Sequence, residues 1–340
     1  MNDRLIRACL RQPVDRTPVW MMRQAGRYLK EYRDIRQKVS FLDLCKNTDL
    51  AAEVSLQPYR ILDVDAVIVF SDILIPVEAM GVPVSLTDKG PEIGNPVRTG
   101  QDVNALRIPD PAAELQFVGS ILKKLRQELQ SAVPLIGFAG APWTLASYMI
   151  EGGGSRSFGE IKGLAFREPA VLHKLLDKLA ATISAYLLFQ IESGAQVIQV
   201  FDTWAGELSR SEYEEFALPY TRKIFEAVGS RVPRILYING CASILESMAN
   251  SGADALSIDW RIPMAEARQR VGNKVSLQGN LDPCLLLGAK DRLVSRTSEI
   301  LEQGGPVGHV LNLGHGILPQ TPVENARAFI EFAKSYRHRR

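Results

Sequence analysis

Two arginines, Arg23 and Arg27, follow directly after the hydrophobic run at residues 18–22, in the sequence MRQAGRYL. The run is short enough to be a buried strand, so both cations are expected where that strand ends. A guanidinium binds a carboxylate through two parallel N–H groups and stays charged at any working pH, so this pair could hold an anionic ligand. A structural ion pair with Asp or Glu is an alternative that the two residues leave open.

Asp72 is a second candidate for chemistry. It follows Ser71 and the apolar run at residues 66–70, so its carboxylate is expected at the end of a buried strand, largely removed from water. Such a carboxylate needs a partner. It could be a catalytic acid or base, an acceptor for N–H groups of a ligand, or the ion-pair partner of Arg23, and the local sequence does not choose between these roles.

Eight short apolar runs are expected to position these candidate residues, and each run is followed by a polar or glycine-containing cluster. All are too short for helices, and most are followed by a longer amphipathic stretch, which is typical of parallel β/α units. One of these helical stretches has a clear start signal, the pair Asp110 and Pro111. The runs are residues 18–22, 66–70, 134–138, 197–201, 234–238, 255–258, 275–277 and 310–313.

The alternation predicts one α/β domain over residues 1–340, a (β/α)8 TIM barrel. Residues 77–99, rich in Gly and Pro, are expected to form an inserted hairpin or loop after the second strand. A doubly wound open sheet is the second choice. No GxGxxG sequence follows the first strand, which weakens a dinucleotide-binding version of that alternative.

Polar and aromatic side chains are frequent just after these runs, and in a barrel the carboxyl ends of the strands carry the active site. His315 is one of them, in the sequence NLGHG, where glycines let the backbone approach a ligand closely. A hydrogen-bonded turn histidine is equally compatible with that sequence. The strand-end residues are Arg23, Arg27, Ser71, Asp72, Trp143, Tyr148, Asp202, Thr203, Asn239, Asp259, Gln278, Asn280 and His315.

Composition limits the partners. The 40 basic and 38 acidic side chains give a formal net charge of +2 at pH 7, too little for a global field that attracts nucleic acid or a membrane. The 4 cysteines show neither the CxxC spacing of a metal site nor the density of a disulfide scaffold, which is typical of reduced thiols. Because no signal-like leader or membrane-length apolar window is present, a cytoplasmic location is expected.

Two other signals are weak. The sequence EGGGS at residues 151–155 could cradle a phosphate, but no GK[ST] follows, and a loop or helix break is favoured. Cys241 and Cys284 lie near predicted strand ends without a histidine nearby in sequence. Packing roles are therefore favoured over a thiol nucleophile.

Several blocks of sequence, spread over nearly the whole chain, resemble the uroporphyrinogen decarboxylase family. They are RQAGRY after PVWM, FSDIL at residues 70–74, GFAGAPWTLASYMIEGGGS at 137–155, LQGNLDP at 277–283 and NLGHG at 312–316. The resemblance implies a homodimeric (β/α)8 barrel and a carboxy-lyase of tetrapyrrole (haem) biosynthesis. This enzyme removes CO2 from the four acetate side chains of uroporphyrinogen III and gives coproporphyrinogen III, with no metal and no prosthetic group.

The family's site residues fall on matching positions of this chain. The resemblance implies that Asp72 collects the four pyrrole N–H groups of the macrocycle, and that Arg23 and Arg27 hold substrate carboxylates, with Arg23 also a candidate proton donor. Thr203 stands where many members carry serine, and the hydroxyl is retained. The predicted catalytic residues are Asp72, Arg23 and Tyr148; the predicted substrate-binding residues are Arg23, Arg27, Arg36, Asp72, Phe138, Tyr148, Thr203 and His315.

The residues are compatible with this chemistry. Loss of CO2 leaves an electron pair, which most enzymes place in a Schiff base, a metal complex or a cofactor. The predicted strand ends offer no lysine and no cluster of metal ligands, but a pyrrole that is protonated at a ring carbon can itself take up the pair. Asp72 would stabilise the resulting cation.

Two rival functions are weighed against this one. Methylcobamide:thiol methyltransferases resemble this fold but use zinc held partly by a His-x-Cys pair after the fifth strand, where this chain has Asn239 and Cys241. A non-catalytic tetrapyrrole-binding protein would keep the arginines and lose the charge-stabilising group. The presence of Asp72 together with both arginines favours an enzyme.

Overall fold

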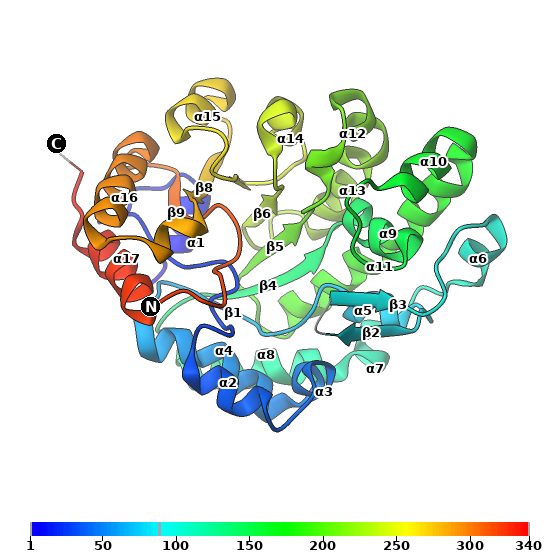
Figure 1. Ribbon diagram of the computed structural model, residues 1–340, viewed down its shortest axis with the longest axis horizontal. Helices are drawn as coiled ribbons and strands as arrows, with labels where there is room; N and C mark the ends of the chain where they lie inside the picture. Colours follow the sequence, from blue (N-terminus) through cyan, green and yellow to red (C-terminus); the bar gives the residue numbers. More distant parts are fainter. Residues whose placement is uncertain (1, 88–89, 339–340) are drawn as a thin grey trace.

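The fold is built on a curled parallel sheet of seven strands. The computed structural model describes residues 2–87 and 90–338. All neighbouring strands run parallel, and their spatial order β1-β4-β5-β6-β7-β8-β9 follows their order along the chain (Figure 1). The strands are β1 (Val67–Ile68), β4 (Leu135–Gly140), β5 (Val197–Phe201), β6 (Arg234–Tyr237), β7 (Ala255–Ser257), β8 (Ser276–Leu281) and β9 (His309–Leu313).

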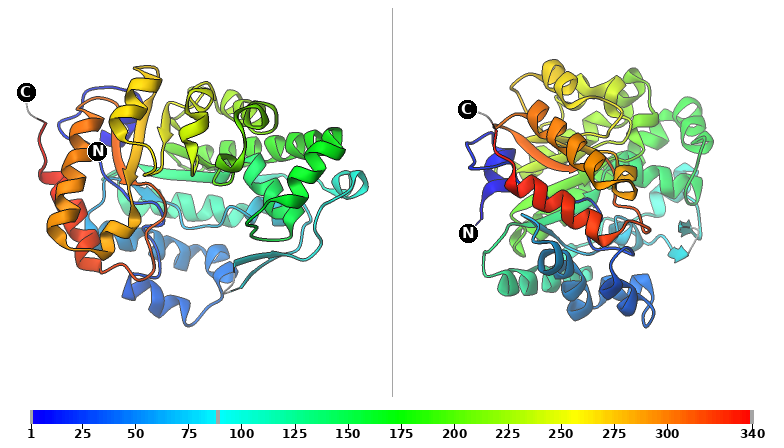
Figure 2. Two further views of the ribbon diagram at one scale, coloured as in Figure 1. Left: turned by 45° about the horizontal axis from the view of Figure 1, so that its top comes forward. Right: turned by 60° about the vertical axis from the view of Figure 1, so that its left-hand side comes forward.

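Helices connect the strands and surround the sheet on its outer side (Figures 1 and 2), as parallel neighbours require a crossover. None of the described helices is long and apolar enough to span a bilayer. The helices before β4 are α1 (Arg4–Cys9), α2 (Lys30–Arg36), α3 (Phe41–Lys46), α4 (Thr48–Leu62), α5 (Ile75–Ala79), α6 (Gly100–Ala105), α7 (Pro111–Glu114) and α8 (Gln116–Leu129). Those after β4 are α9 (Pro142–Glu151), α10 (Gly159–Arg167), α11 (Pro169–Glu192), α12 (Arg210–Phe216), α13 (Leu218–Val228), α14 (Leu245–Met248), α15 (Met264–Val271), α16 (Lys290–Gly304) and α17 (Val323–Ser335), with 3-10 turns η1 (Ala205–Glu207), η2 (Cys241–Ile244) and η3 (Pro283–Leu287).

Seven of the eight predicted runs are confirmed as strands of this sheet. Every residue of β4, β8 and β9 is buried, because parallel strands are covered on both faces, and this explains why the runs read as continuous apolar stretches. The helix predicted after Asp110 is two helices, α7 and α8. The backbone at Leu115 leaves the helical region, with φ of −121° and ψ of 30°. Asp110 is confirmed as the N-cap of α7, since its carboxylate accepts a hydrogen bond from Ala112 N–H at 3.0 Å.

The predicted first strand, residues 18–22, is the exception. It makes only an isolated parallel bridge, between Val19 and Leu311 of β9. Met22 N–H donates to the side-chain oxygen of Asn312 at 2.9 Å instead of continuing the ladder. A side-chain amide therefore takes the place of the backbone partner that a regular strand would have.

The opposite side of this segment is tied to the residues that precede β1. Asp65 N–H donates to Val19 O at 2.8 Å, and Val19 N–H donates to Asp65 Oδ2 at 2.9 Å. Arg16 donates two hydrogen bonds to the same carboxylate, at 2.6 and 2.7 Å, and both side chains are buried. Ion pairing and hydrogen bonding together make this buried carboxylate tolerable. Residues 18–22 thus lie between β9 and the chain just before β1.

A small antiparallel pair, β2 (Val84–Thr87) with β3 (Gly90–Ile93), follows β1 and α5. Residues 88 and 89 between the two strands lie outside the described part of the chain. The glycine-rich loop at residues 151–155 packs on this pair: Gly152 O accepts a hydrogen bond from the backbone of β3, and a Cβ on Gly153 would lie 2.7 Å from Pro91 O. Gly152 also ends α9 with a φ of 86°. The favoured interpretation, a helix break, is confirmed.

The N-terminal cap of the last helix, α17, differs from the one that the sequence predicts. The spacing of Thr321 and Glu324 predicts a capping box, but α17 begins at Val323 with Pro322 as its N-cap and no side-chain cap. Glu324 is then the second helical residue rather than the third, so the reciprocal hydrogen bonds of a capping box cannot form. The predicted box is wrong by one position.

Candidate active site

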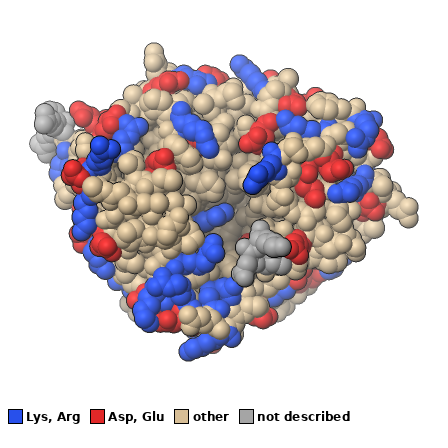
Figure 3. Space-filling view, in the orientation of Figure 1, with Lys and Arg blue, Asp and Glu red and all other residues tan. Residues whose placement is uncertain are grey.

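The carboxyl ends of β4, β5 and β6 point toward the centre of the view in Figure 1. In the same orientation, the space-filling view of Figure 3 shows a hollow in the surface there. Lys and Arg side chains gather beside this hollow over α2. That helix contributes Lys30, Arg33 and Arg36. Since the formal net charge of the chain is only +2, this cationic rim is a local feature.

Arg23 and Asp72 lie close to each other without forming a contact ion pair. None of the ion pairs among the described residues includes Arg23. Asp72 is half-buried, its Oδ1 accepts a hydrogen bond from Leu74 N–H at 2.8 Å, and no described residue donates to its Oδ2. Burial raises the pKa of Asp72, while the Leu74 N–H and the Arg23 charge act in the opposite direction. The alternative that Asp72 is the ion-pair partner of Arg23 is therefore wrong.

His315 lies on the turn after β9. Its Nδ1 accepts a hydrogen bond from Gly316 N–H at 2.6 Å, so Nε2 carries the proton of the neutral ring. Burial lowers the pKa of His315 to about 4, with further contributions from the positive charges of Arg23 and Arg261. At neutral pH the imidazole is uncharged and can donate a hydrogen bond from Nε2.

Tyr148, on α9, lies near the charges of Arg23 and Asp72. Burial raises the pKa of its phenol, Arg23 lowers it and Asp72 raises it. Trp204 contacts the Tyr148 ring edge-on, with 6.1 Å between ring centroids, and Thr203 precedes Trp204 in the turn after β5. The structure thus brings the three predicted catalytic residues together. Half-buried Thr203 is near them because the next residue in the chain, Trp204, contacts Tyr148.

An arc of aromatic rings joins Phe138 to His315 across three strands. Phe138 on β4 contacts Phe201 on β5 with centroids 5.6 Å apart, Phe201 contacts Tyr237 on β6 at 5.8 Å, and Tyr237 contacts His315 at 6.0 Å. Tyr237 OH also donates to Gly314 O at 3.1 Å. Sequence reasoning selected Phe138 and missed Phe201 and Tyr237. Each of these two is the last residue of its strand, which is the signal that could have identified them.

Arg27 and Arg36 lie on the α2 side of the site. Both positive charges lower the pKa of Tyr32, whose pKa burial raises, so the two guanidiniums lie near one ring. Arg36 donates to Val39 O, and its guanidinium carbon lies 5.7 Å from the centroid of the Phe41 ring. Arg27 is exposed. Arg36 is thus held by its own helix and loop, while Arg27 remains open to a ligand.

Other polar strand-end residues fill the interior rather than the hollow. Gln278 Nε2 donates to Gln199 Oε1 at 3.1 Å and to Ser257 Oγ at 2.9 Å, and its Oε1 accepts from Trp20 Nε1 at 3.0 Å. Asn280 donates to two backbone carbonyls behind β7. The Gln278 side chain is thus satisfied by its neighbours, whereas Asn280 Oδ1 accepts no hydrogen bond from the described residues.

Asp202, at the end of β5, is a fully buried carboxyl that holds the start of α9. Its Oδ1 accepts from Thr144 N–H at 3.1 Å and from Thr144 Oγ1 at 2.8 Å, while no described residue donates a hydrogen bond to Oδ2. Thr144 Oγ1 in turn accepts from Trp204 N–H at 3.1 Å. Burial raises the pKa of Asp202 to about 7, against the effect of the Thr144 hydrogen bonds.

Replacing this carboxyl by an amide, Asp202→Asn, is expected to stabilise the protein more at pH 8 than at pH 5. The carboxyl has a pKa near 3.8 when unfolded and about 7 when folded, so its burial penalty grows as pH rises from 4 to 7 and is then constant. Of this rise, only the two pH units between pH 5 and pH 7 separate the two conditions, which corresponds to at most about 3 kcal/mol. Urea unfolding of both proteins at the two pH values measures the difference in free energy of unfolding.

Asp49→Asn, at a side chain that is 81% exposed, is the matched control and should show no such trend. If the stability difference between Asp202→Asn and the parent protein is equal at both pH values, the pKa of Asp202 is not raised in the folded protein.

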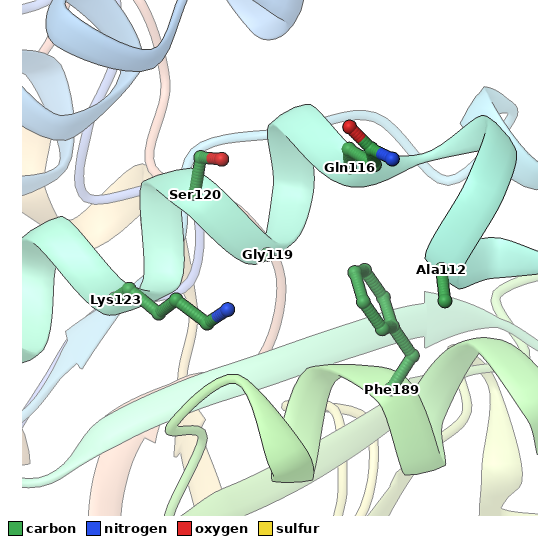
Figure 4. A pocket seen from close by; sticks show the side chains of 6 residues that line it. All are labelled: Ala112, Gln116, Gly119, Ser120, Lys123 and Phe189. Atoms are coloured by element: carbon green, nitrogen blue, oxygen red, sulfur yellow. The ribbon is translucent and has the colours of Figure 1, made fainter.

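A separate cavity of about 330 Å³ lies between α8 and α11 in the outer layer (Figure 4). Lys123 and Phe189 extend toward it from the two helices. It is lined by Ala112, Gln116, Gly119, Ser120, Lys123 and Phe189. Since none of the strand-end residues lines it, this cavity is distinct from the candidate active site.

The fold and the strand-end geometry define the class of protein: a parallel α/β protein with cationic and aromatic side chains gathered where its strands end. A family model for uroporphyrinogen decarboxylase (URO-D) matches residues 1–336, and the chain belongs to this family. It is 52% identical over 335 residues to uroporphyrinogen decarboxylase of Gloeobacter violaceus, covering 97% of this chain and 96% of the relative. It is 51% identical over 332 residues to that of Myxococcus xanthus, covering 97% and 95%.

The methyltransferase rival has a structural counterpart. A methyltransferase from Methanosarcina mazei superposes with a TM-score of 0.86 and 25% identity, covering 98% of each chain. Within residues 2–87 and 90–338, no group of three or more His, Cys, Asp or Glu side chains is placed to hold a metal ion. The identity to the decarboxylases is about twice as high as that to the methyltransferase, which is why the chain groups with the decarboxylases.

Proposed function

We propose that this protein decarboxylates the four acetate side chains of uroporphyrinogen III, one after another, to give coproporphyrinogen III and CO2. The observation that carries this proposal is the Asp72 carboxylate, half-buried and lacking a contact cation, with one oxygen that accepts no hydrogen bond from the described residues. Such an oxygen is suited to a ligand rich in N–H donors. Membership of the family and about 50% identity over 97% of the chain support the same reaction.

Each chemical step consumes one proton and releases one CO2. A proton added to the ring carbon of a pyrrole makes a cation conjugated to the acetate side chain. The bond to the carboxylate then breaks, its electron pair neutralises that cation, and a proton completes the new methyl group while the ring carbon loses its own. Asp72, near the pyrrole nitrogens, stabilises the cation in a site shielded from water.

The remaining residues divide the work of binding. Arg23 and Arg27 bind carboxylate side chains of the substrate. Arg23 or Tyr148, both of which interact electrostatically with Asp72, exchanges a proton with the ring held there. Neutral His315 donates a hydrogen bond from Nε2. The further binding residues of this proposal are Arg36, Phe138 and Thr203.

We also propose that the sheet is a (β/α)8 barrel forming one domain over residues 1–340, with β2 and β3 as an inserted hairpin. The support is the segment around Val19. Its neighbours Pro18 and Trp20 hydrogen-bond to Leu311 of β9 on one side, and Val19 hydrogen-bonds to Asp65 on the other. The homodimer and the cytoplasmic location stay predictions, and analytical ultracentrifugation of the purified protein tests the first of them.

An anaerobic assay tests the reaction. Chelator-treated protein is incubated with uroporphyrinogen III, and products are oxidised to porphyrins and separated by carboxylate number. Seven-, six-, five- and then four-carboxylate species should appear in order without added metal. If folded protein binds the substrate and releases no CO2, the proposed reaction is wrong, and metal content and thiol methyl transfer become the next measurements.

A further inference from the structure

Arg261, which follows β7, lies on the opposite side of the His315 turn from Arg23. A Cβ on Gly314 would lie 2.7 Å from Trp260 N, so the turn packs directly on the backbone next to Arg261. At the other end of the same turn, a Cβ on Gly316 would lie 2.3 Å from Arg23 Cδ. The turn thus packs on Arg23 at one end and on the residue next to Arg261 at the other, although the two arginines are far apart in the sequence.

The Arg261 side chain is oriented by three contacts. Its Nη1 donates to Asn239 Oδ1 at 3.1 Å and to Asp259 Oδ2, and its guanidinium carbon lies 4.4 Å from the centroid of the Trp260 ring. A guanidinium stacked on an indole in this way is fixed in plane. The pairing residue Asp259 is fully buried, whereas the Arg261 side chain is 49% exposed.

One edge of this guanidinium remains open. Both hydrogen bonds use Nη1, and no residue in the described part of the chain accepts from Nε or Nη2. These two nitrogens form the parallel pair of donors that fits a carboxylate. The edge is therefore a ready carboxylate site whose geometry is set before any ligand arrives.

Arg261 and Arg23 also lie near the same two side chains. The positive charges of Arg23 and Arg261 both act on His315 and on the buried phenol of Tyr237. This agrees with their packing at the two ends of the His315 turn. Uroporphyrinogen carries eight carboxylates around its ring, so a cation in addition to Arg23 and Arg27 also has a carboxylate to bind.

We propose that Arg261 is a substrate-binding residue that holds a carboxylate on the side of the macrocycle away from Arg23, and so favours highly carboxylated tetrapyrroles. The inference rests on the proposed function and deepens it. Arg261 contributes to binding in the ground state and transition state alike, since it lies across the His315 turn from the group formed by Arg23, Asp72 and Tyr148. Its loss should therefore raise KM and leave kcat nearly unchanged.

The test compares Arg261→Gln and Arg261→Lys with Arg60→Gln. Arg60, on α4, is a matched control because its side chain is 50% exposed and also pairs with an acidic residue, Glu53. For Arg261→Gln, KM for uroporphyrinogen III and Kd for uroporphyrin III, from fluorescence quenching, should each rise about tenfold, the effect of one charged hydrogen-bonded contact. For Arg261→Lys, KM and Kd should lie between those of the parent protein and Arg261→Gln, because lysine keeps the charge and loses the parallel pair of N–H donors.

Each outcome decides one question. A change below twofold in both KM and Kd, or an equal rise in Arg60→Gln, would overturn the role of Arg261 while leaving the decarboxylase function intact. Absence of turnover in the parent protein would reject the proposed function, whereas the uroporphyrin titration would still measure carboxylate binding at Arg261. If Arg261→Gln does not fold, Arg261→Lys, which keeps a cation beside buried Asp259, supplies the decisive comparison.

Discussion

Asp72→Asn is expected to lower kcat for uroporphyrinogen III about a hundred- to a thousandfold, the usual effect of removing one preorganised electrostatic contact from a transition state. The amide oxygen can still accept the Leu74 N–H hydrogen bond that Asp72 accepts now at 2.8 Å, so the local turn is kept. What is lost is the negative charge that stabilises the protonated pyrrole. Because burial raises the pKa of Asp72 by more than the Leu74 N–H and the Arg23 charge lower it, the folded protein loses no net stabilisation with the charge, and its stability should stay near that of the parent.

The measurement is single-turnover loss of the first carboxylate, together with thermal unfolding. Asp110→Asn is the matched control, since Asp110 also accepts an N–H two residues ahead, from Ala112 at 3.0 Å, but on an exposed turn before α7. Turnover of Asp72→Asn within a few-fold of the parent would show that the carboxylate charge is not used in the reaction. A large loss of stability with no specific loss of kcat would assign Asp72 a structural role.

Gly316→Ala should lower kcat/KM about a hundredfold, although it changes no polar group. A Cβ at this position would lie 2.3 Å from Arg23 Cδ and 2.8 Å from Arg23 Cγ, so the arginine stem must move. A displacement of about 1 Å at a binding cation is enough for a loss of this size. Since the displaced atoms belong to a flexible, exposed side chain, the cost in folding free energy should be small.

Gly100→Ala provides the control. At Gly100 an added Cβ would meet Val171 Cγ2 at 3.7 Å, an ordinary contact at the start of α6. The same steady-state assay on both variants separates displacement of Arg23 from a general glycine effect. Unchanged kcat/KM in Gly316→Ala would mean that Arg23 reaches its ligand along another path, or that it does not contact the substrate.

Much of the fold could be predicted because parallel strands buried on both faces are continuous apolar runs, which local sequence reveals. Residues 18–22 read the same way, yet they form one bridge only. Their partners are the Asn312 side chain and the Asp65 carboxylate, groups far away in sequence. No local pattern encodes that choice, since an apolar run carries the same signal whether backbone or side chains complete its hydrogen bonds.

The candidate site, too, could be predicted only in part from the sequence. The identity and order of Arg23, Asp72, Tyr148 and His315 could be read from motifs at strand ends. Whether Asp72 pairs with Arg23 could not be read, because the answer depends on where two side chains from separate loops come to rest.

The sequence by itself determined the order of β/α units, the residue types at their carboxyl ends and the family, because periodicity and motifs are properties of neighbouring residues. Only the tertiary structure decided that Arg23 contacts no anion among the described residues, that Phe138, Phe201 and Tyr237 form one arc with His315, and that Arg261 offers an open edge. Those facts depend on contacts between strands distant in the chain, which form when the sheet curls and its ends converge.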